Sequence, residues 1–355
     1  MHTLSVASDA FTVVVCEKPS TSRALLPAIR RHSEFFPPGR TVIVHASGHA
    51  NPAFFFPSHT GWHDFPVVLD TKMRGSERTD ATDHDNFYRG LLVLDDGSHR
   101  PIGDEALRLL CQDPSEVRLV CACDLDASGA WMFAKACSTV LSTSGFPKAF
   151  DIRLLSLDPG SVGLAVKAAV DGLTTDAREV GFRAKELQRR FEYNWWVNAH
   201  ALLRPVMSRV GLASDRALSK FEVQLAYFVL DRGPLPISVL MREMNRWTGT
   251  GRYSPGTLGT ASSRGQMITN LRDRGVFAPE PGSSDGPPGS DHVQLTASGL
   301  ALLGALPKDS RDLDLPQRLA AWAADPVACR HKADSYIRHW FGKVKRGNPP
   351  SAPKS

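Results

Sequence analysis

Two apolar, β-rich runs each end abruptly in acidic residues, and this feature constrains the fold of the chain most strongly. Residues 11–16 (FTVVVC) lead directly into Glu17, and residues 117–123 (VRLVCAC) lead into Asp124 and Asp126. Both runs are followed by segments that have the apolar spacing of a helix. Strands that alternate with helices indicate βαβ units around a mostly parallel sheet.

The same patterning extends over the first part of the chain and predicts a Rossmann-like α/β domain at 1–158. Further strands are expected at 41–45 and 152–157, and helices at 21–31, 104–112 and 130–141. The polar stretch 70–100 is expected to be rich in loops.

The second part of the chain has a different character and predicts a mainly helical domain. Helices are expected at 161–172, 180–207, 215–231, 235–247 and 262–274, followed by a hairpin of 275–277 with 293–296. Two helices and then a hairpin is the order of a winged helix-turn-helix. We therefore expect a helical groove region at 159–232, a winged-helix-like part at 233–329, and a basic, partly disordered tail at 330–355.

Composition excludes few classes of protein but sets the compartment we expect. The chain has 355 residues, 42% hydrophobic and 22% charged, with a net charge of +5, which permits a polyanionic partner without requiring one. No apolar run approaches the roughly 18 residues that span a bilayer, and the first residues lack a signal-peptide pattern. Six cysteines without a disulfide framework suggest reduced thiols. We expect a cytoplasmic protein without a membrane partner.

The acidic residues after the two strands are candidate metal ligands. Open α/β sheets place ligands at the carboxyl ends of their strands, and Mg²⁺ takes one or two carboxylates together with phosphate oxygens. Alone, Asp124 and Asp126 are equally consistent with a plain acidic turn. Glu17 at a second strand end, with Lys18 able to meet a phosphate, favours a metal site and is the signature of a Toprim domain.

Segments along most of residues 11–325 resemble type IA DNA topoisomerases, in particular the topoisomerase III branch. VVVCEKPSTSRALLPAI is similar to the N-terminal motif of that family, and LVCACDLDASGA stands where the family has Asp-x-Asp-Arg-Glu-Gly-Glu. The further matching segments, in the order of the family, are VHASGHANPAFFFP, WHDFP, RAKELQRRFEYNWWVNAHALLRP, LSKFEVQLAYFVLDR, YSPGTLGTASSRGQMITNLRDRGVF, VQLTASGLALLGALP and LPQRLAAWAADP.

Two departures from the family pattern bear on activity. The interval in which the family builds its arch and its nucleophilic tyrosine has collapsed to about 231–254, and none of the five tyrosines lies in a Tyr-x-Arg-Thr context. In place of Arg-Glu-Gly-Glu the chain has Ala127-Ser-Gly-Ala130, so the third metal carboxylate becomes Ser128. Glu222 stands where the family has a phosphate-facing arginine.

The resemblance implies a set of site residues. Glu17, Asp124 and Asp126 would bind a weakened Mg²⁺ site, and these three with Lys18 would form any catalytic centre. The residues expected to contact nucleic acid are Lys18, Arg189, Arg190, Trp195, Lys220, Gln224, Arg264 and Arg272. For the arginines and the tryptophan, a solvated helix face and an ordinary core residue are the alternatives.

Three functions follow as expectations. The first is a nucleoid-associated, topoisomerase-like pseudoenzyme that binds single-stranded or junction-containing DNA and does not relax DNA alone. The second is a Toprim-type nuclease that nicks DNA with a metal ion. The third is a non-catalytic subunit that joins a partner protein in a DNA-processing complex.

Overall fold

The chain divides into two compact units, which are described one at a time. The computed structural model describes residues 10–46, 62–70, 88–96, 98–103, 117–141, 146–279 and 292–349. The first unit comprises 1–53 and 72–186, and the second comprises 54–71 and 187–355, so the division falls within helix α5 (Glu179–Asn198). The expected helix at 104–112 lies outside the described residues.

The first unit is built on a six-stranded sheet with the order β4-β3-β2-β1-β5-β6. β1 pairs in parallel with β2 and β5, and β5 pairs in parallel with β6, whereas β3 and β4 are antiparallel. The strands are β1 (Phe11–Cys16), β2 (Thr41–Ala46), β3 (Tyr88–Val93), β4 (His99–Ile102), β5 (Val117–Cys121) and β6 (Phe150–Asp151). The mostly parallel α/β sheet is confirmed.

Two details of the expected sheet are wrong. Strand β3 lies inside the stretch 70–100 that is expected to be loop-rich, and β4 begins at the end of that stretch. The sequence of β4 is polar because it is an exposed edge strand. The strand expected at 152–157 is not formed, since β6 ends at Asp151 and Leu155 is 87% exposed. An apolar side chain in that stretch therefore does not indicate a buried strand.

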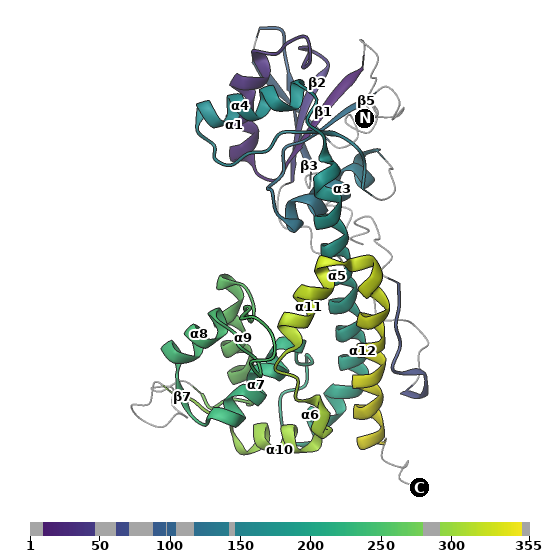
Figure 1. Ribbon diagram of the computed structural model, residues 1–355, viewed down its shortest axis with the longest axis vertical. Helices are drawn as coiled ribbons and strands as arrows, with labels where there is room; N and C mark the ends of the chain where they lie inside the picture. Colours follow the sequence, from purple (N-terminus) through teal and green to yellow (C-terminus); the bar gives the residue numbers. More distant parts are fainter. Residues whose placement is uncertain are drawn as a thin grey trace. The chain divides into compact units, whose positions relative to one another are not determined.

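Helices cover both faces of the sheet (Figure 1). On one face, α1 (Pro19–Arg30) and α4 (Pro159–Val170) lie side by side and pack apolar residues such as Ile29 and Val166 against the sheet. On the other face, α3 (Ala127–Leu141) packs Phe133 against β1 and β5. Short turns join β1 to α1 and β5 to α3, which places the N-termini of both helices at the carboxyl edge of the sheet.

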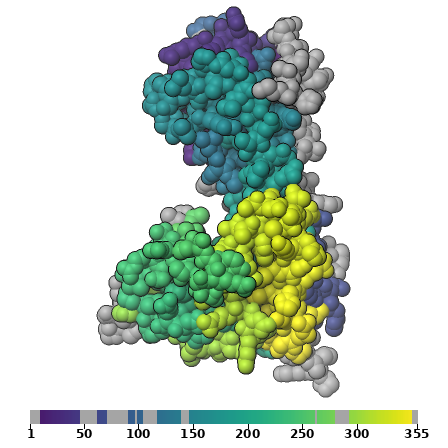
Figure 2. Space-filling view, viewed as in Figure 1, coloured from purple at the N-terminus to yellow at the C-terminus, as the bar shows by residue number. Residues whose placement is uncertain are grey.

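The second unit is a helical assembly around one large apolar core. After α5 the chain continues through a π turn (Ala199–Leu203) into α6 (Arg204–Arg209), α7 (Lys220–Arg232), α8 (Ile237–Asn245), α9 (Ala261–Asp273), α10 (Ala297–Ala305), α11 (Leu315–Ala324) and α12 (Pro326–Gly347). In Figure 2 the yellow surface of the C-terminal helices adjoins the green surface of the middle of this unit. The mainly helical character expected after the sheet is confirmed.

A small β element flanks helices α8 and α9: β7 precedes α8, and the other paired residues follow α9. Phe277 pairs with Leu295, and β7 (Leu235–Pro236) pairs with β8 (His292–Val293). Hydrogen bonds from Ala278 N–H to Gln294 and from Thr296 N–H to Val276 complete the pairing. The expected order of two helices and a hairpin is therefore present.

Residues 330–347, which the sequence predicts to be part of a basic tail, belong to helix α12. This helix buries one face, with Cys329, Ala333, Ile337, Trp340, Phe341 and Val344 at helical spacing, and the last five of these belong to the core of the second unit. The basic residues lie on its other faces, so the segment is an amphipathic helix, and its high charge led to the wrong prediction of a tail. None of the described helices is long and apolar enough to cross a membrane.

Candidate nucleic-acid and metal site

The acidic residues after β1 and β5 meet at one edge of the sheet. The two strands are parallel neighbours in the register Val15 with Cys121, so the residues that follow them emerge at the same edge. Glu17 comes directly after β1, and Asp124 and Asp126 come after β5. The structure thus brings together the three carboxylates that the sequence singled out.

Glu17 lies in an environment that disfavours its negative charge. Its Oε1 atom is buried and has no hydrogen-bond partner. Burial raises the pKa of Glu17, and the charges of Asp124 and Asp126 raise it further, while a backbone hydrogen bond at Asp124 and the Lys18 ammonium lower it. A cation at this edge would relieve that repulsion.

Lys18 is the side chain that contacts the acidic pair. Its Nζ lies 3.2 Å from Asp124 Oδ2, and the two side chains are 60% and 51% exposed. This hydrogen bond raises the pKa of Lys18. Because the pair is exposed, it contributes little to stability, and separating the two side chains would cost little free energy.

Asp126 and Gly129 shape the turn between β5 and α3. Asp126 Oδ1 accepts a 2.8 Å hydrogen bond from Gly129 N–H and so caps the first turn of the helix. A Cβ atom on Gly129 would lie 2.0 Å from the carbonyl oxygen of Asp124. The glycine of the DLDASG motif is therefore required by a close backbone approach rather than by a ligand.

The β5–α3 turn is stabilised by Arg178, a residue that the sequence pattern does not indicate. Its NH1 group donates to the carbonyl oxygens of Cys123 at 3.0 Å and of Asp124 at 2.8 Å, and its Nε donates to buried Asp151 at 2.8 Å. Arg178 lies 54 residues after Asp124 along the chain, at the end of a short 3-10 helix (Thr175–Arg178) before α5, so no local pattern identifies it.

The acidic oxygens at this edge are of the kind that Mg²⁺ binds in proteins. Carboxylate oxygens are the preferred protein ligands of Mg²⁺, and the unpartnered Oε1 of Glu17 is an atom that such an ion would satisfy. Across the described ranges, no group of three or more His, Cys, Asp or Glu side chains is placed to hold a metal ion. The three carboxylates are therefore not arranged as a complete set of metal ligands, and an ion at this edge would depend on water and phosphate for its remaining positions.

Two of the residues expected to contact nucleic acid share a cavity in the second unit. Lys220 at the start of α7 and Arg264 in α9 line a cavity of about 500 Å³, together with apolar residues that include Phe191 and Leu319. Both cations are largely buried, and the Nε of Arg264 has no hydrogen-bond partner. The cavity is large enough for a nucleotide.

Lys220 has a carboxylate and two aromatic rings around it. Its Nζ lies 3.3 Å from Glu192 Oε1, 4.7 Å from the centre of the Phe221 ring and 5.8 Å from that of Phe191. Burial lowers the pKa of Lys220, and the charge of Glu192 opposes this effect. The ammonium is held in place by internal partners, unlike the exposed ammonium of Lys18.

Three other expected contacts are occupied within the protein. Trp195 is a core residue whose indole N–H donates to Leu218, and Gln224 is fully buried against Ser310 and Asp312. Arg189 pairs with Glu192 at 3.3 Å. Arg272 lies half-buried in the last turn of α9. The expectation of base stacking on Trp195 is replaced by packing against Trp340 and Phe341.

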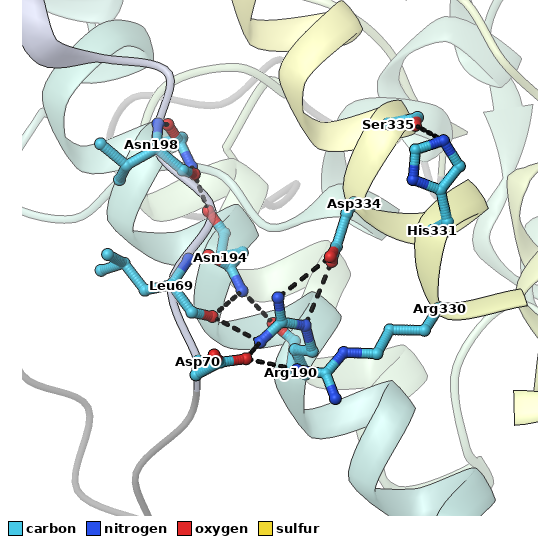
Figure 3. Close-up of polar contacts among 10 residues, drawn as sticks. Leu69, Asp70, Arg190, Asn194, Asn198, Arg330, His331, Asp334 and Ser335 are labelled. Carbon is cyan, nitrogen blue, oxygen red and sulfur yellow. Dashed lines mark hydrogen bonds and ion pairs between the residues drawn. The ribbon is translucent and has the colours of Figure 1, made fainter. Parts of the chain in front are cut away.

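Arg190 also has a structural role rather than an exposed one (Figure 3). Its guanidinium donates to Leu69 O at 2.8 Å and to Asp334 at 3.0 and 3.1 Å, and it pairs with Asp70. Asp70 also pairs with Arg330 of α12. Arg190 thus joins the 62–70 segment and α12 to α5.

Two asparagines of α5 bind the backbone of the same segment. Asn198 accepts from Val67 N–H at 2.8 Å and donates to Val67 O at 2.7 Å. Asn194 does the same for Leu69, at 2.6 and 2.9 Å. The two side-chain amides thus satisfy the backbone N–H and C=O groups of Val67 and Leu69, as a neighbouring β-strand would.

Comparison with known proteins adds no assignment. No protein-family model matches the sequence, and a search of curated proteins finds no match.

Proposed function

We propose that this protein is a reduced, type IA topoisomerase-like DNA-binding protein that carries a degenerate Mg²⁺ site and does not relax DNA alone. The observation that carries the proposal is the meeting of Glu17, Asp124 and Asp126 at the carboxyl edge of two parallel strands. The unpartnered oxygen of Glu17 supports a cation there. Toprim is the domain type that this arrangement of acidic residues favours.

The second unit supports the DNA-binding part of the proposal. Helices α8 and α9 precede paired segments near 277 and 295, in the order of a winged helix. The cavity lined by Lys220 and Arg264 has cationic groups beside aromatic rings. Proteins that bind single-stranded nucleic acid use this combination for phosphate contact and base stacking.

Within the site, the residues of this chain would have separate tasks. Glu17, Asp124 and Asp126 would hold Mg²⁺, and the bound ion would attract phosphate oxygens to the edge of the sheet. Lys18 would leave Asp124 and pair with a phosphate, and Arg178 keeps the Asp124 carbonyl in place through its hydrogen bond.

Three of the described tyrosines, Tyr193, Tyr227 and Tyr336, lie in environments that disfavour a nucleophile, which supports the absence of strand passage. Burial raises the pKa of Tyr193, raises that of Tyr227 to about 12, and raises that of Tyr336 further. A nucleophile needs the opposite shift or a neighbouring base. The short interval 231–254 forms the end of α7, strand β7, α8 and a turn region instead of a further domain.

The test compares the wild-type protein with Glu17→Gln, Asp124→Asn and Asp126→Asn variants. We expect single-stranded DNA to bind more tightly with Mg²⁺ than without it in a fluorescence anisotropy titration, and the variants to lose this increase. We expect supercoiled DNA to remain supercoiled. Formation of a covalent tyrosine–DNA adduct, or equal Mg²⁺ response in all four proteins, would contradict the proposal.

Metal-dependent nicking is the second candidate, and the exposed Lys18–Asp124 pair favours it. A lysine next to the acidic residues can stabilise the charge that develops on a phosphate during hydrolysis. Nicking that requires Mg²⁺ and disappears in both Asp124→Asn and Lys18→Gln would establish this activity. Nicking that persists in those variants would assign the activity elsewhere.

A further inference from the structure

A small cavity of about 260 Å³ opens beside the acidic edge, and its lining includes Arg153 and Arg178. We infer that this cavity binds a phosphate monoester, the terminal phosphate of a DNA strand. The DNA part of this inference rests on the proposed function. The cavity itself is argued from four features of the first unit.

The first feature is an unsatisfied donor. The Arg178 side chain is only 6% exposed, and its Nε and NH1 groups are fully engaged with Asp151 and with the β5–α3 turn. Its NH2 group is buried and has no hydrogen-bond partner. A buried guanidinium nitrogen without an acceptor is costly, so an acceptor oxygen from a ligand would be stabilising.

The second feature is an excess of positive charge at the back of the cavity. Arg153 Nε lies 2.9 Å from Asp151 Oδ2, and Arg178 Nε lies 2.8 Å from Asp151 Oδ1. Two guanidinium groups therefore share one fully buried carboxylate, which leaves one positive charge uncompensated within this cluster. The Arg153 side chain is 39% exposed, so it can reach a ligand at the mouth.

The third feature is the small size of the lining side chains. Ala127 and Ala130, in the first turn of α3, stand where the resembling family has charged residues, and they leave this space open. Gly181 adds to the space, because a Cβ atom there would lie 3.5 Å from the Cα of Ala127. The α3 N-terminus also supplies a partial positive charge.

The fourth feature is the composition of the donor set, which favours a phosphate over a carboxylate. Arg178 keeps its unpartnered NH2, and Arg153 uses its Nε for Asp151, so the donors that a ligand would meet belong to two guanidinium groups. A phosphate monoester carries up to about two negative charges and has three terminal acceptor oxygens, so it can bind both guanidinium groups at once. At about 260 Å³, the cavity is below the range of sites that enclose a whole drug-sized ligand.

One lining residue opposes an anion. Asp126 is the acidic side chain in the described lining, and its Oδ1 is already bound to Gly129 N–H. We therefore expect phosphate to bind more tightly when Mg²⁺ is present at the carboxylates. The dependence on Arg153 should remain in either condition.

The experiment measures anisotropy with the full chain and a short single-stranded oligonucleotide that carries a 5′-phosphate, a 3′-phosphate or neither, with the label on the opposite end. We expect at least one phosphorylated form to bind about tenfold more tightly than the unphosphorylated form. Arg153→Gln and Ala177→Glu should abolish that difference. Ala177 lines the cavity and is exposed, so Ala177→Glu should fold, whereas Arg153→Gln also removes one ion pair of the buried Asp151. Thermal unfolding of both variants checks that they are folded.

Two matched variants serve as controls. Arg183→Gln removes an exposed guanidinium of the first unit, and Val180→Glu adds a carboxylate at an exposed position, and neither residue lines the cavity. Both should keep the preference. Equal binding of all three oligonucleotides by the wild-type protein, or the same loss in control and cavity variants, would overturn the inference.

Inorganic phosphate separates this inference from the proposed function. If the protein binds no oligonucleotide but binds inorganic phosphate in a calorimetric titration, and Arg153→Gln prevents this, the DNA proposal fails and the phosphate cavity stands. If the unphosphorylated oligonucleotide binds and phosphate has no effect in any form, the cavity inference fails alone.

Discussion

Glu222 shows how a residue aligned with a binding position can belong to the fold instead. Its carboxylate accepts from Ser219 N–H at 2.7 Å while Ser219 Oγ accepts from Glu222 N–H, which forms a capping box at the start of α7. The same carboxylate lies 3.4 Å from Arg274, and both side chains are less than 10% exposed. The Ser-x-x-Glu spacing in the sequence was the signal for this role.

The first prediction follows from this environment. Replacing Glu222 by the arginine of the resembling family should not restore DNA affinity. It should lower the free energy of unfolding by at least about 3 kcal/mol, because it places two buried guanidinium groups together and removes the cap. Urea denaturation measures the effect, and the double variant Glu222→Arg with Arg274→Glu should recover part of it. An unchanged denaturation midpoint in Glu222→Arg would contradict this interpretation.

Arg190 gives the second prediction at the residue scale. Arg190→Met should lower the free energy of unfolding by about 2–3 kcal/mol, because Asp334 and Leu69 O lose their partner. The value is less than for a fully buried pair, since the Asp70 side chain is 73% exposed. The neighbouring Arg189→Met, whose pair with Glu192 is a partly exposed helix pair, should cost about 0.5 kcal/mol or less. Similar decreases in the free energy of unfolding for Arg190→Met and Arg189→Met would show that the contacts of Arg190 do not stabilise the protein more than an exposed helix pair does.

At the scale of elements, the β5–α3 turn determines where the acidic side chains lie. A Cβ atom on Gly129 would collide with the Asp124 carbonyl, so Gly129→Ala must move either the helix start or the turn. We expect a loss of about 1–3 kcal/mol in stability and weaker Mg²⁺ binding. Gly163→Ala in α4, where a Cβ meets nothing within 4 Å, should instead stabilise by about 0.5–1 kcal/mol.

Thermal unfolding and a Mn²⁺ titration followed by electron paramagnetic resonance would compare the two glycine variants. If Gly129→Ala is as stable as Gly163→Ala and keeps its metal affinity, the close approach does not control the turn.

The elements that could be predicted are those whose burial is visible in local sequence. Strands β1, β2 and β5 are continuous apolar runs, and the helices after β1 and β5 have clear periodicity, so these parts and the acidic edge followed from the sequence. Edge strand β4 is polar because it is exposed. Arg178 reaches the turn only through the folded chain, so pattern analysis could not select it.

For the molecule as a whole, the basic C-terminal segment is part of the structural core. Trp340 of α12 is 3% exposed and packs against Trp195 of α5 with 4.6 Å between ring centres. Its charged neighbours in the sequence masked this contact. The net charge of a segment therefore indicates that one of its faces meets solvent, but it gives no information on whether another face packs in the core.

The fourth prediction tests this role. Trp340→Ala should lower the free energy of unfolding by about 3–5 kcal/mol, as expected for the removal of a buried aromatic side chain. Arg338→Ala, on the exposed side of the same helix, should change it by about 0.5 kcal/mol or less. Circular dichroism during urea denaturation provides the measurement. Equal denaturation midpoints for Trp340→Ala and Arg338→Ala would show that helix α12 does not stabilise the core.

The asparagine contacts of α5 have a consequence for the order of folding. The amides of Asn194 and Asn198 bind backbone groups that lie 125 and 131 residues earlier in the chain. Closing a loop of that length costs conformational entropy before any contact compensates for it. Residues 62–70 therefore cannot make these contacts during synthesis until α5 has been synthesised. The second unit is complete only after this early segment has packed against α5.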